Sequence, residues 1–223
     1  MPPTQPDRGD HYFSAEPSGA SARRRVELLL AEGRVVALTT DRGVFSADAV
    51  DDGTRVLLAS AAPDPGAAVL ADVGCGYGAI AVALALRAPE ARVWAIDVNE
   101  RARALCRENA DANGVGDRVE VVAPADVPAE LVIDEVWSNP PIRIGKAALH
   151  DLLSGWLDRL RPGSGRAVLV VQKHLGADSL ARWIEASGRP TERIASRAGY
   201  RVLRVSTGPG CAPAPGPPDE ASS

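Results

Sequence analysis

The sequence predicts an α/β fold with a mainly parallel sheet, and three observations in residues 69–99 carry this prediction. A short apolar run at residues 69–73 enters a glycine-rich turn, and the alanine- and leucine-rich residues 79–86 favour a helix after it. A second apolar run, residues 93–96, ends on the acid Asp97. A strand, a glycine turn, a helix and a second strand ending on an acid make half of a doubly wound sheet.

The N-terminal quarter of the chain predicts an appendage to this sheet, residues 11–62, made of a helix and a β-hairpin. We expect residues 1–10, which are polar and proline-rich, to be disordered. The mixed apolar and charged residues 21–31 predict the helix, and Gly33 lies where it would end.

β-prone residues predict the hairpin that follows. Residues 35–39 and 44–45 flank Asp41-Arg42-Gly43, which is a turn signal. Beyond the hairpin, Thr54 can cap a short helix at residues 55–61. A break rich in proline then separates the appendage from the sheet.

Strands and helices continue to alternate after the first unit of the sheet. Asn99 can cap a helix that runs to about residue 112. Apolar residues spaced three and four apart predict another helix at residues 147–160, and a last helix is expected at residues 178–186. The remaining strands are expected at residues 119–122, 135–137, 167–171, 192–196 and 202–205. This alternation predicts one core domain at residues 67–207.

Composition places the 223-residue chain among ordinary globular proteins, and its net charge of −4 does not by itself indicate a nucleic-acid partner. The three cysteines have neither metal-ligand nor disulfide spacing, so we expect no metal site. The sequence shows no signal peptide and no long apolar span, so we expect a cytoplasmic protein without membrane contact. The proline-rich residues 208–223 are expected to be a disordered tail.

The spacing of the turn glycines indicates which ligand the sheet binds. Gly74, Gly76 and Gly78 follow Asp72 in the pattern G-x-G-x-G, whereas a dinucleotide-binding turn has G-x-G-x-x-G. The turn resembles the first motif of class I S-adenosylmethionine (SAM) methyltransferases. That resemblance implies SAM as the cofactor, with the turn lying against its methionine part.

Polar residues follow the ends of the predicted strands, where an open α/β sheet binds its ligands. Asp97 can accept hydrogen bonds from both hydroxyls of a ribose. Asp126, or the backbone beside it at Ala125, can meet the adenine amino group. We therefore expect the cofactor to lie along this edge of the sheet.

The tetrapeptide N-P-P-I at residues 139–142 is the second informative motif, because it ends a predicted strand. Two prolines make a stiff, extended bend. Such a bend can aim the side-chain oxygen of Asn139 and the carbonyl of Pro140 at one point. Two acceptors that converge on an amine hold its N–H groups and leave its lone pair facing a methyl donor, which is catalysis by orientation. We predict Asn139, Pro140 and Pro141 as the catalytic residues.

As a set, the motifs resemble the small-domain class I methyltransferases related to the ribosomal RNA guanine-N2 methyltransferases of the small subunit. The resemblance covers residues 11–206 and implies a Rossmann-like sheet of seven strands with an antiparallel last strand and helices on both faces. The motifs that carry it are H-Y-F-S (11–14), F-S with D-x-G-T (45–46 and 51–54), D-V-G-C-G-Y-G (72–78), D-V-N with R-A (97–102), E-N-A-x-x-N-G (108–114) and N-P-P-I-R-x-G-K (139–146).

The resemblance also assigns roles outside the glycine turn. In the family, the F-S and G-T segments lie against the cofactor, and the asparagine of N-P-P holds the target amine, a role that carries over to Asn139. The residues expected to bind the cofactor are Phe45, Ser46, Gly53, Thr54, Asp72, Gly74, Cys75, Gly76, Gly78, Asp97, Val98, Asn99, Ala125, Asp126 and Asn139.

One departure from the family concerns the target base. Many amino-methyltransferases have an aromatic residue after N-P-P, and this chain has Ile142. Stacking on the base must then be weaker or come from elsewhere, for example Tyr12. We expect Ile142, Arg143, Lys146 and Tyr12 to meet the substrate.

The sequence therefore predicts SAM-dependent N-methylation of an exocyclic amine by a monomer or weak dimer, and the resemblance implies guanine N2 of ribosomal RNA as the target. Two alternatives stay open. One is N-methylation of a small metabolite or a protein amide, which the acidic net charge favours. The other is a non-catalytic protein that binds SAM or RNA. A positive surface around Asn139 would favour RNA.

Overall fold

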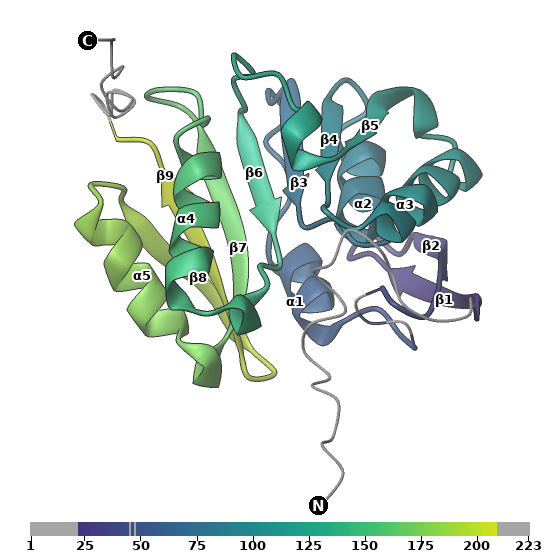
Figure 1. Cartoon of the computed structure of the whole chain (residues 1–223), viewed down its shortest axis with the longest axis horizontal. Coiled ribbons are helices and arrows are strands. Elements are labelled where there is room, and N and C mark those ends of the chain that lie inside the picture. Colours follow the sequence, from purple (N-terminus) through teal and green to yellow (C-terminus); the bar gives the residue numbers. More distant parts are fainter. Residues whose placement is uncertain (1–21, 45, 47, 209–223) are drawn as a thin grey trace, which may run out of the picture.

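The computed structural model describes residues 22–44, 46 and 48–208. The predictions for residues 1–10, Tyr12, Phe45 and the tail from residue 209 onward lie outside these described residues. The described chain forms one open sheet with helices on both faces and a small hairpin beside it (Figure 1).

The main sheet has seven strands in the order β5-β4-β3-β6-β7-β9-β8. Neighbouring strands pair in parallel, except that β9 runs antiparallel to both β7 and β8. The predicted seven-stranded, mostly parallel sheet with an antiparallel last strand is thereby confirmed. The strands are β3 (Val69–Val73), β4 (Arg92–Ile96), β5 (Val119–Val122), β6 (Glu135–Ser138), β7 (Arg166–Gln172), β8 (Thr191–Arg197) and β9 (Tyr200–Ser206).

Helices cover both faces of the sheet, as predicted, and β7 shows why. Its apolar run is buried on both sides, which is typical of a central parallel strand. Val168 and Val170 pack toward one core with α1, α2 and α3, while Leu169 and Val171 pack toward the other with α4 and α5. The helices are α1 (Asp52–Ser60), α2 (Ala79–Arg87), α3 (Glu100–Ala112), α4 (Lys146–Leu157) and α5 (Ala177–Ala186), with single 3₁₀ turns η1 (Gly116–Arg118), η2 (Pro124–Asp126), η3 (Ile142–Ile144) and η4 (Lys173–Leu175).

The appendage is a β-hairpin, and the helix predicted just before Gly33 is wrong. This segment forms β1 (Arg24–Leu29), which pairs antiparallel with β2 (Val35–Thr40) across a turn in which Gly33 has a φ of +82°. Val26 and Leu28 are buried while their neighbours are exposed, an alternation with the period of a strand. The arginine, glutamate and leucine residues of this segment suit either structure, and pairing with β2 together with burial of one face in the core decides for the strand.

Two further expectations for the appendage change with this hairpin. The sequence predicts Val44 in the second strand of the hairpin, but β1 takes that place beside β2, and Val44 lies buried in the turn that follows. The first helix begins three residues earlier than predicted, and its cap is Asp51 rather than Thr54. Asp51 Oδ2 accepts a hydrogen bond from the backbone N–H of Thr54 at 3.2 Å, which satisfies a free donor of the first turn.

Two asparagines of the E-N-A-x-x-N-G motif attach the hairpin to α3. Asn109 exchanges hydrogen bonds with the backbone of Thr39, at 2.7 and 2.8 Å, and Asn113 Nδ2 donates to the carbonyl of Ala37 at 3.0 Å. Asn109 Nδ2 also donates to the carbonyl of Tyr77 at 2.8 Å, so the same side chain supports the glycine turn. The hairpin is therefore placed relative to the turn through one buried amide.

Candidate active site

A cavity of about 750 Å³ opens at the carboxyl ends of β3, β4 and β6. It lies where the strand order reverses, between β3 and β6, the usual binding position in an open α/β sheet. Its walls come from the glycine turn, the start of α3, the N-P-P segment, the start of α1 and the turn after β2. In Figure 1 this is the edge of the sheet that faces α1.

The glycine turn forms one wall with its backbone. The N–H groups of Gly74 and Cys75 donate to the carbonyl of Ile96 at 2.8 and 3.0 Å, which joins the end of β3 to the end of β4. Gly74 and Gly76 have φ of +76° and +54°, which favours glycine, and open space lies where their side chains would be. A ligand can therefore approach the backbone here.

Gly78 serves a different purpose, although it belongs to the same motif. A side chain at this position would lie 2.6 Å from the sulfur of Cys106 in α3. Cys75, which lines the cavity, is also buried, and its contact with Cys106 together with burial raises the pKa of its thiol. Gly78 lets α2 and α3 pack closely, and both cysteines are buried packing residues.

The carboxylate of Asp97 lines the cavity and is fixed in place by two backbone hydrogen bonds. Its Oδ2 accepts from the N–H of Gly76 and its Oδ1 from the N–H of Asn99, both at 2.8 Å. Burial raises the pKa of Asp97, while these backbone donors and the nearby Arg103 oppose that rise. Each carboxylate oxygen has room for a second donor, so Asp97 can accept two hydroxyl groups at once.

Asp72 lies behind the turn and is fully buried. Its Oδ2 accepts from the N–H of Ala81 at 2.9 Å, and its Oδ1 has no partner among the described residues. Burial, and to a smaller extent the charge of Asp97, raise the pKa of Asp72 to about 8. At neutral pH this side chain is therefore mostly a neutral acid that joins β3 to α2.

The amide of Asn139 is oriented by the start of α1. Its Nδ2 donates to Asp51 Oδ2 at 2.8 Å and to Thr54 Oγ1 at 3.2 Å. Because a carboxylate can only accept, the amide nitrogen must face Asp51. The amide oxygen then lies on the other side of the group, where no described residue donates to it.

The two prolines form a tighter turn than the extended bend expected from sequence. The carbonyl of Pro140 accepts from the N–H of Ile142 at 2.8 Å, and Pro141 has φ −74° and ψ 77°, an inverse γ-turn. Asn139, Pro140, Pro141 and Ile142 all line the cavity. The Pro140 carbonyl is thus already engaged, and the amide oxygen of Asn139 is the more available acceptor.

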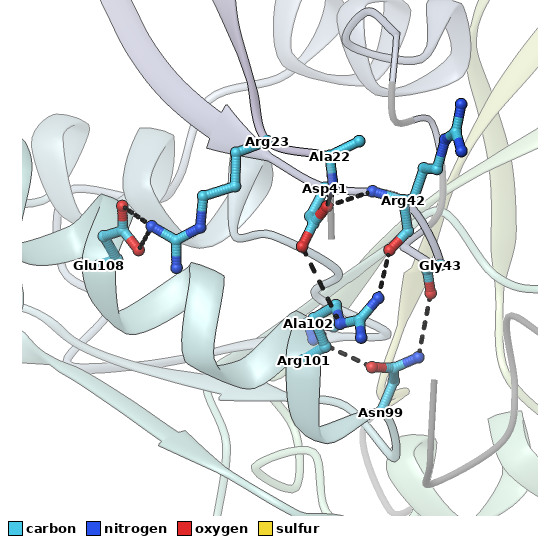
Figure 2. A network of polar contacts seen from close by, with 9 residues as sticks. All are labelled: Ala22, Arg23, Asp41, Arg42, Gly43, Asn99, Arg101, Ala102 and Glu108. Atoms are coloured by element: carbon cyan, nitrogen blue, oxygen red, sulfur yellow. Dashed lines mark hydrogen bonds and ion pairs between the residues drawn. The ribbon is translucent and has the colours of Figure 1, made fainter. Parts of the chain in front are cut away.

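The turn after β2 is attached to the start of α3, as Figure 2 shows. Asn99 caps α3 through its Oδ1, 3.0 Å from the N–H of Ala102, and its Nδ2 donates to the carbonyl of Gly43 at 3.3 Å. Arg101 Nη1 donates to the carbonyl of Arg42 at 2.9 Å. The side chains of Asn99 and Arg101, from the D-V-N and R-A segments, therefore both bind the backbone of this turn.

The attached turn places Val44 and Ser46 in the wall of the cavity. The residue before β1 is also tied to this helix, because Arg23 forms an ion pair with Glu108 of α3 at 3.0 Å (Figure 2). The hairpin and the turn after it are therefore held along α3, and that turn forms a wall of the site.

The structure brings most predicted site residues into one cavity. Those that line it are Ser46, Thr54, Gly74, Cys75, Gly76, Asp97, Val98, Asn99, Asn139, Pro140, Pro141, Ile142 and Arg143. Gly53, Asp72 and Gly78 do not line it. Ala125 and Asp126 are exposed in η2, and Pro124 lines the cavity in their place; Lys146 lines a smaller neighbouring pocket.

Sequence reasoning did not assign several cavity residues to the site, chiefly Asp51, Tyr77, Trp156 and Tyr200. Asp51 belongs to the D-x-G-T motif, which was the available signal. Trp156 fits the spacing of apolar residues along α4, so the sequence predicts a core residue at this position. No local pattern marks Tyr200, because a strand pairing brings it to this edge.

Four exposed cations lie at the edge of the sheet where the cavity opens, and one of them, Arg143, lines the cavity itself. Arg143, Lys146, Lys173 and Arg197 come from η3, the start of α4, η4 and the end of β8, and all four are exposed. The backbone N–H of Lys173 donates to the carbonyl of Gly199 at 2.8 Å, which places η4 beside the β8–β9 turn. Among the described residues, none of these four cations forms an ion pair.

The sheet order, the glycine turn and the cavity at the strand reversal together define a class I methyltransferase fold. Residues 35–204 match the methyltransferase small domain, and the chain belongs to this family of SAM-dependent methyltransferases. The described residues include no helix long and apolar enough to cross a membrane.

Similar proteins include the uncharacterized protein YbxB of Bacillus subtilis, which is 32% identical over 88% of this chain and 98% of its own length. The ribosomal RNA small subunit methyltransferase C of Hahella chejuensis is 34% identical over 82% of this chain. The 16S rRNA N2 methyltransferase of T. thermophilus, solved with AdoMet and guanosine, superposes with a TM-score of 0.70 at 24% identity over 86% of this chain. The chain spans about half the length of both rRNA methyltransferases, 53% and 52%.

Proposed function

We propose that this protein methylates the exocyclic amine of a nucleobase in RNA, with guanine N2 of ribosomal RNA as the target. The observation that carries the proposal is the orientation of Asn139. Asp51 and Thr54 hold its amide nitrogen, which leaves its amide oxygen for the cavity. Asp97 lines the same cavity. An amide oxygen in this place can accept an N–H of the target amine and direct the nitrogen lone pair.

The cavity suits SAM. Its lining combines apolar side chains with the carboxylate of Asp97, and open space borders the backbone of Gly74 and Gly76. We propose that Asp97 holds the ribose hydroxyls, that the glycine turn meets the methionine part, and that Val44 and Ser46 close the side. Bound SAM supplies an electrophilic methyl group. Asn139 orients the attacking amine, and the proton that this nitrogen loses passes to water.

The four cations at this edge support RNA over a small metabolite. The chain is acidic overall, at −4, yet Arg143, Lys146, Lys173 and Arg197 are exposed and form no ion pair with the described residues. Phosphate groups flanking a target base would lie against such cations. Two further findings support a ribosomal target: the 34% identity to a small-subunit rRNA methyltransferase and the fold shared with an rRNA N2 methyltransferase.

The test is methyl transfer from labelled SAM to ribosomal RNA, both naked and in small subunits. Wild type is compared with Asn139→Ala, and the SAM dissociation constant is measured for both by calorimetry. We expect transfer to fall roughly a hundredfold or more in the variant, with SAM affinity nearly unchanged. Incorporation that persists in Asn139→Ala would contradict the role of the amide.

Reversing the charge of the exposed cations distinguishes an RNA substrate from a small amine. Lys173→Glu and Arg197→Glu should raise the KM for RNA, whereas Arg92→Glu, which changes an exposed cation at the start of β4, should not. Methylation of a small amine or a protein amide, without transfer to RNA, would overturn the proposed substrate.

A further inference from the structure

Tyr200 is the aromatic side chain of the cavity that remains accessible. Among the described residues, the rings that line the cavity are those of Tyr77, Trp156 and Tyr200. Tyr77 and Trp156 are buried, with 5% and 7% of their surface exposed, whereas Tyr200 is half-buried. It begins β9 and pairs with Gln172, the last residue of β7, so it lies at the same edge of the sheet as the N-P-P turn.

Gly53 explains how the ring reaches the site. A side-chain carbon on Gly53 would lie 2.9 Å from Cε1 and 3.1 Å from Cδ1 of Tyr200. It would also lie 2.8 Å from Asp51 Oδ2. Because Gly53 has no side chain, the ring of Tyr200 and the carboxylate of Asp51 can both lie close to its backbone.

The same carboxylate connects Tyr200 to the amine-holding amide. Asp51 Oδ2, which lies beside Gly53, accepts from Asn139 Nδ2 at 2.8 Å. Burial and the charges of Asp51 and Asp52 raise the pKa of Tyr200, so its ring stays neutral. The Tyr200 ring and the Asn139 amide therefore flank one carboxylate within the same cavity.

We infer that Tyr200 is the platform on which the target base stacks while Asn139 accepts from its exocyclic amine. The inference rests on the proposed function and specifies its substrate as a planar heteroaromatic amine. Ile142 follows the two prolines and offers an aliphatic surface to the cavity. The ring that the N-P-P segment lacks is thus supplied by a different strand, β9.

This arrangement favours a nucleobase over an aliphatic amide. An aromatic ring face gains from stacking on the extended plane of any base. The plane of a side-chain amide covers a much smaller part of the ring. Tyr200 would then contribute to the binding of substrate, and Asn139 to the transfer step.

The experiment measures kcat and KM for small-subunit RNA in Tyr200→Phe and Tyr200→Leu, with SAM affinity and Tm for each variant. Leucine keeps an apolar contact with Gly53, and phenylalanine keeps the ring. We expect the Phe variant to resemble wild type, and the Leu variant to raise KM roughly tenfold or more with SAM affinity unchanged. Trp94→Leu, which removes a half-buried aromatic side chain outside the cavity, is the control and should leave KM unchanged.

Three results would overturn the stacking role. A Leu variant with wild-type KM would show that the ring does not hold the base. Equal losses in the Phe and Leu variants would assign the effect to the hydroxyl group. A parallel loss of SAM affinity would place the ring against the cofactor. If wild type methylates RNA in these cases, the proposed function still stands. Wild type that methylates only aliphatic amides overturns both proposals.

Discussion

Asp51 and Asn139 lie 88 residues apart in the chain, and their side chains meet at 2.8 Å in the cavity. The carboxylate that caps α1 also determines which way the amide of Asn139 points. Helix capping and the orientation of the acceptor are therefore performed by the same group, and substitutions at Asp51 can separate them.

We predict that Asp51→Ser reduces transfer while leaving the fold and the cofactor site intact. Serine caps helices about as well as aspartate, so Tm should change little. The shorter side chain cannot reach Asn139, whose amide then loses its fixed direction. We expect kcat to fall roughly ten- to a hundredfold, with SAM affinity unchanged. Asp51→Ala should show the same loss of kcat and an additional loss of about 1 kcal/mol in stability. Unchanged kcat in Asp51→Ser would contradict the positioning role.

Asp97→Ala should weaken SAM binding. Two charge-assisted hydrogen bonds to hydroxyl groups would be lost, which predicts a rise in the dissociation constant of roughly tenfold to a hundredfold. Because burial raises the pKa of Asp97, the wild-type affinity should fall on acidification at a higher pH than for an ordinary aspartate. Calorimetry across pH tests both points. If the affinity for SAM did not change with pH below neutrality, Asp97 would not be a ligand of the cofactor.

Substitutions at Asn99 test the wall of the cavity. Asn99→Asp keeps an oxygen to cap α3 but replaces the donor to the carbonyl of Gly43 with a repelling oxygen. We expect near wild-type Tm and a severalfold loss of SAM affinity, because the turn carrying Val44 and Ser46 is released. Asn99→Ala should lose about 1 kcal/mol of stability in addition. Wild-type affinity in Asn99→Asp would show that the wall stays in place without this contact.

Asp72 predicts an unusual dependence of stability on pH. Its pKa is about 8 in the folded chain and near 4 in the unfolded chain, so the folded state binds the proton more tightly. The stabilisation from this proton is complete below about pH 4 and is lost as the pH rises toward about 8, by an amount on the order of a few kcal/mol. Asp72→Asn removes this term.

Thermal unfolding across pH measures the effect. The Tm of Asp72→Asn should exceed that of wild type by an amount that grows between about pH 4 and pH 8. Asp117→Asn, at an exposed carboxylate of η1, is the control and should show no such growth. A constant difference between Asp72→Asn and wild type would mean that the carboxyl group does not titrate in this range.

Several elements could be predicted from sequence because their signals are local. The apolar runs of β3 and β4, the glycines between them and the cap at Asn99 each depend on a few adjacent residues. The expectation failed for β1, whose arginine, glutamate and leucine residues suit a helix as well as a strand. Pairing with β2 and burial of Val26 and Leu28 in the core decided the outcome there.

The sequence by itself determined the class of sheet, the edge at which ligands bind and the asparagine at the end of β6, because hydrophobic period and turn chemistry act over short distances. Only the tertiary structure decided what surrounds that asparagine. Asp51 reaches it from α1 and Tyr200 from β9, and Asn99 fixes the wall formed after β2. These partners are brought together by strand order and helix packing, which no local pattern of residues encodes.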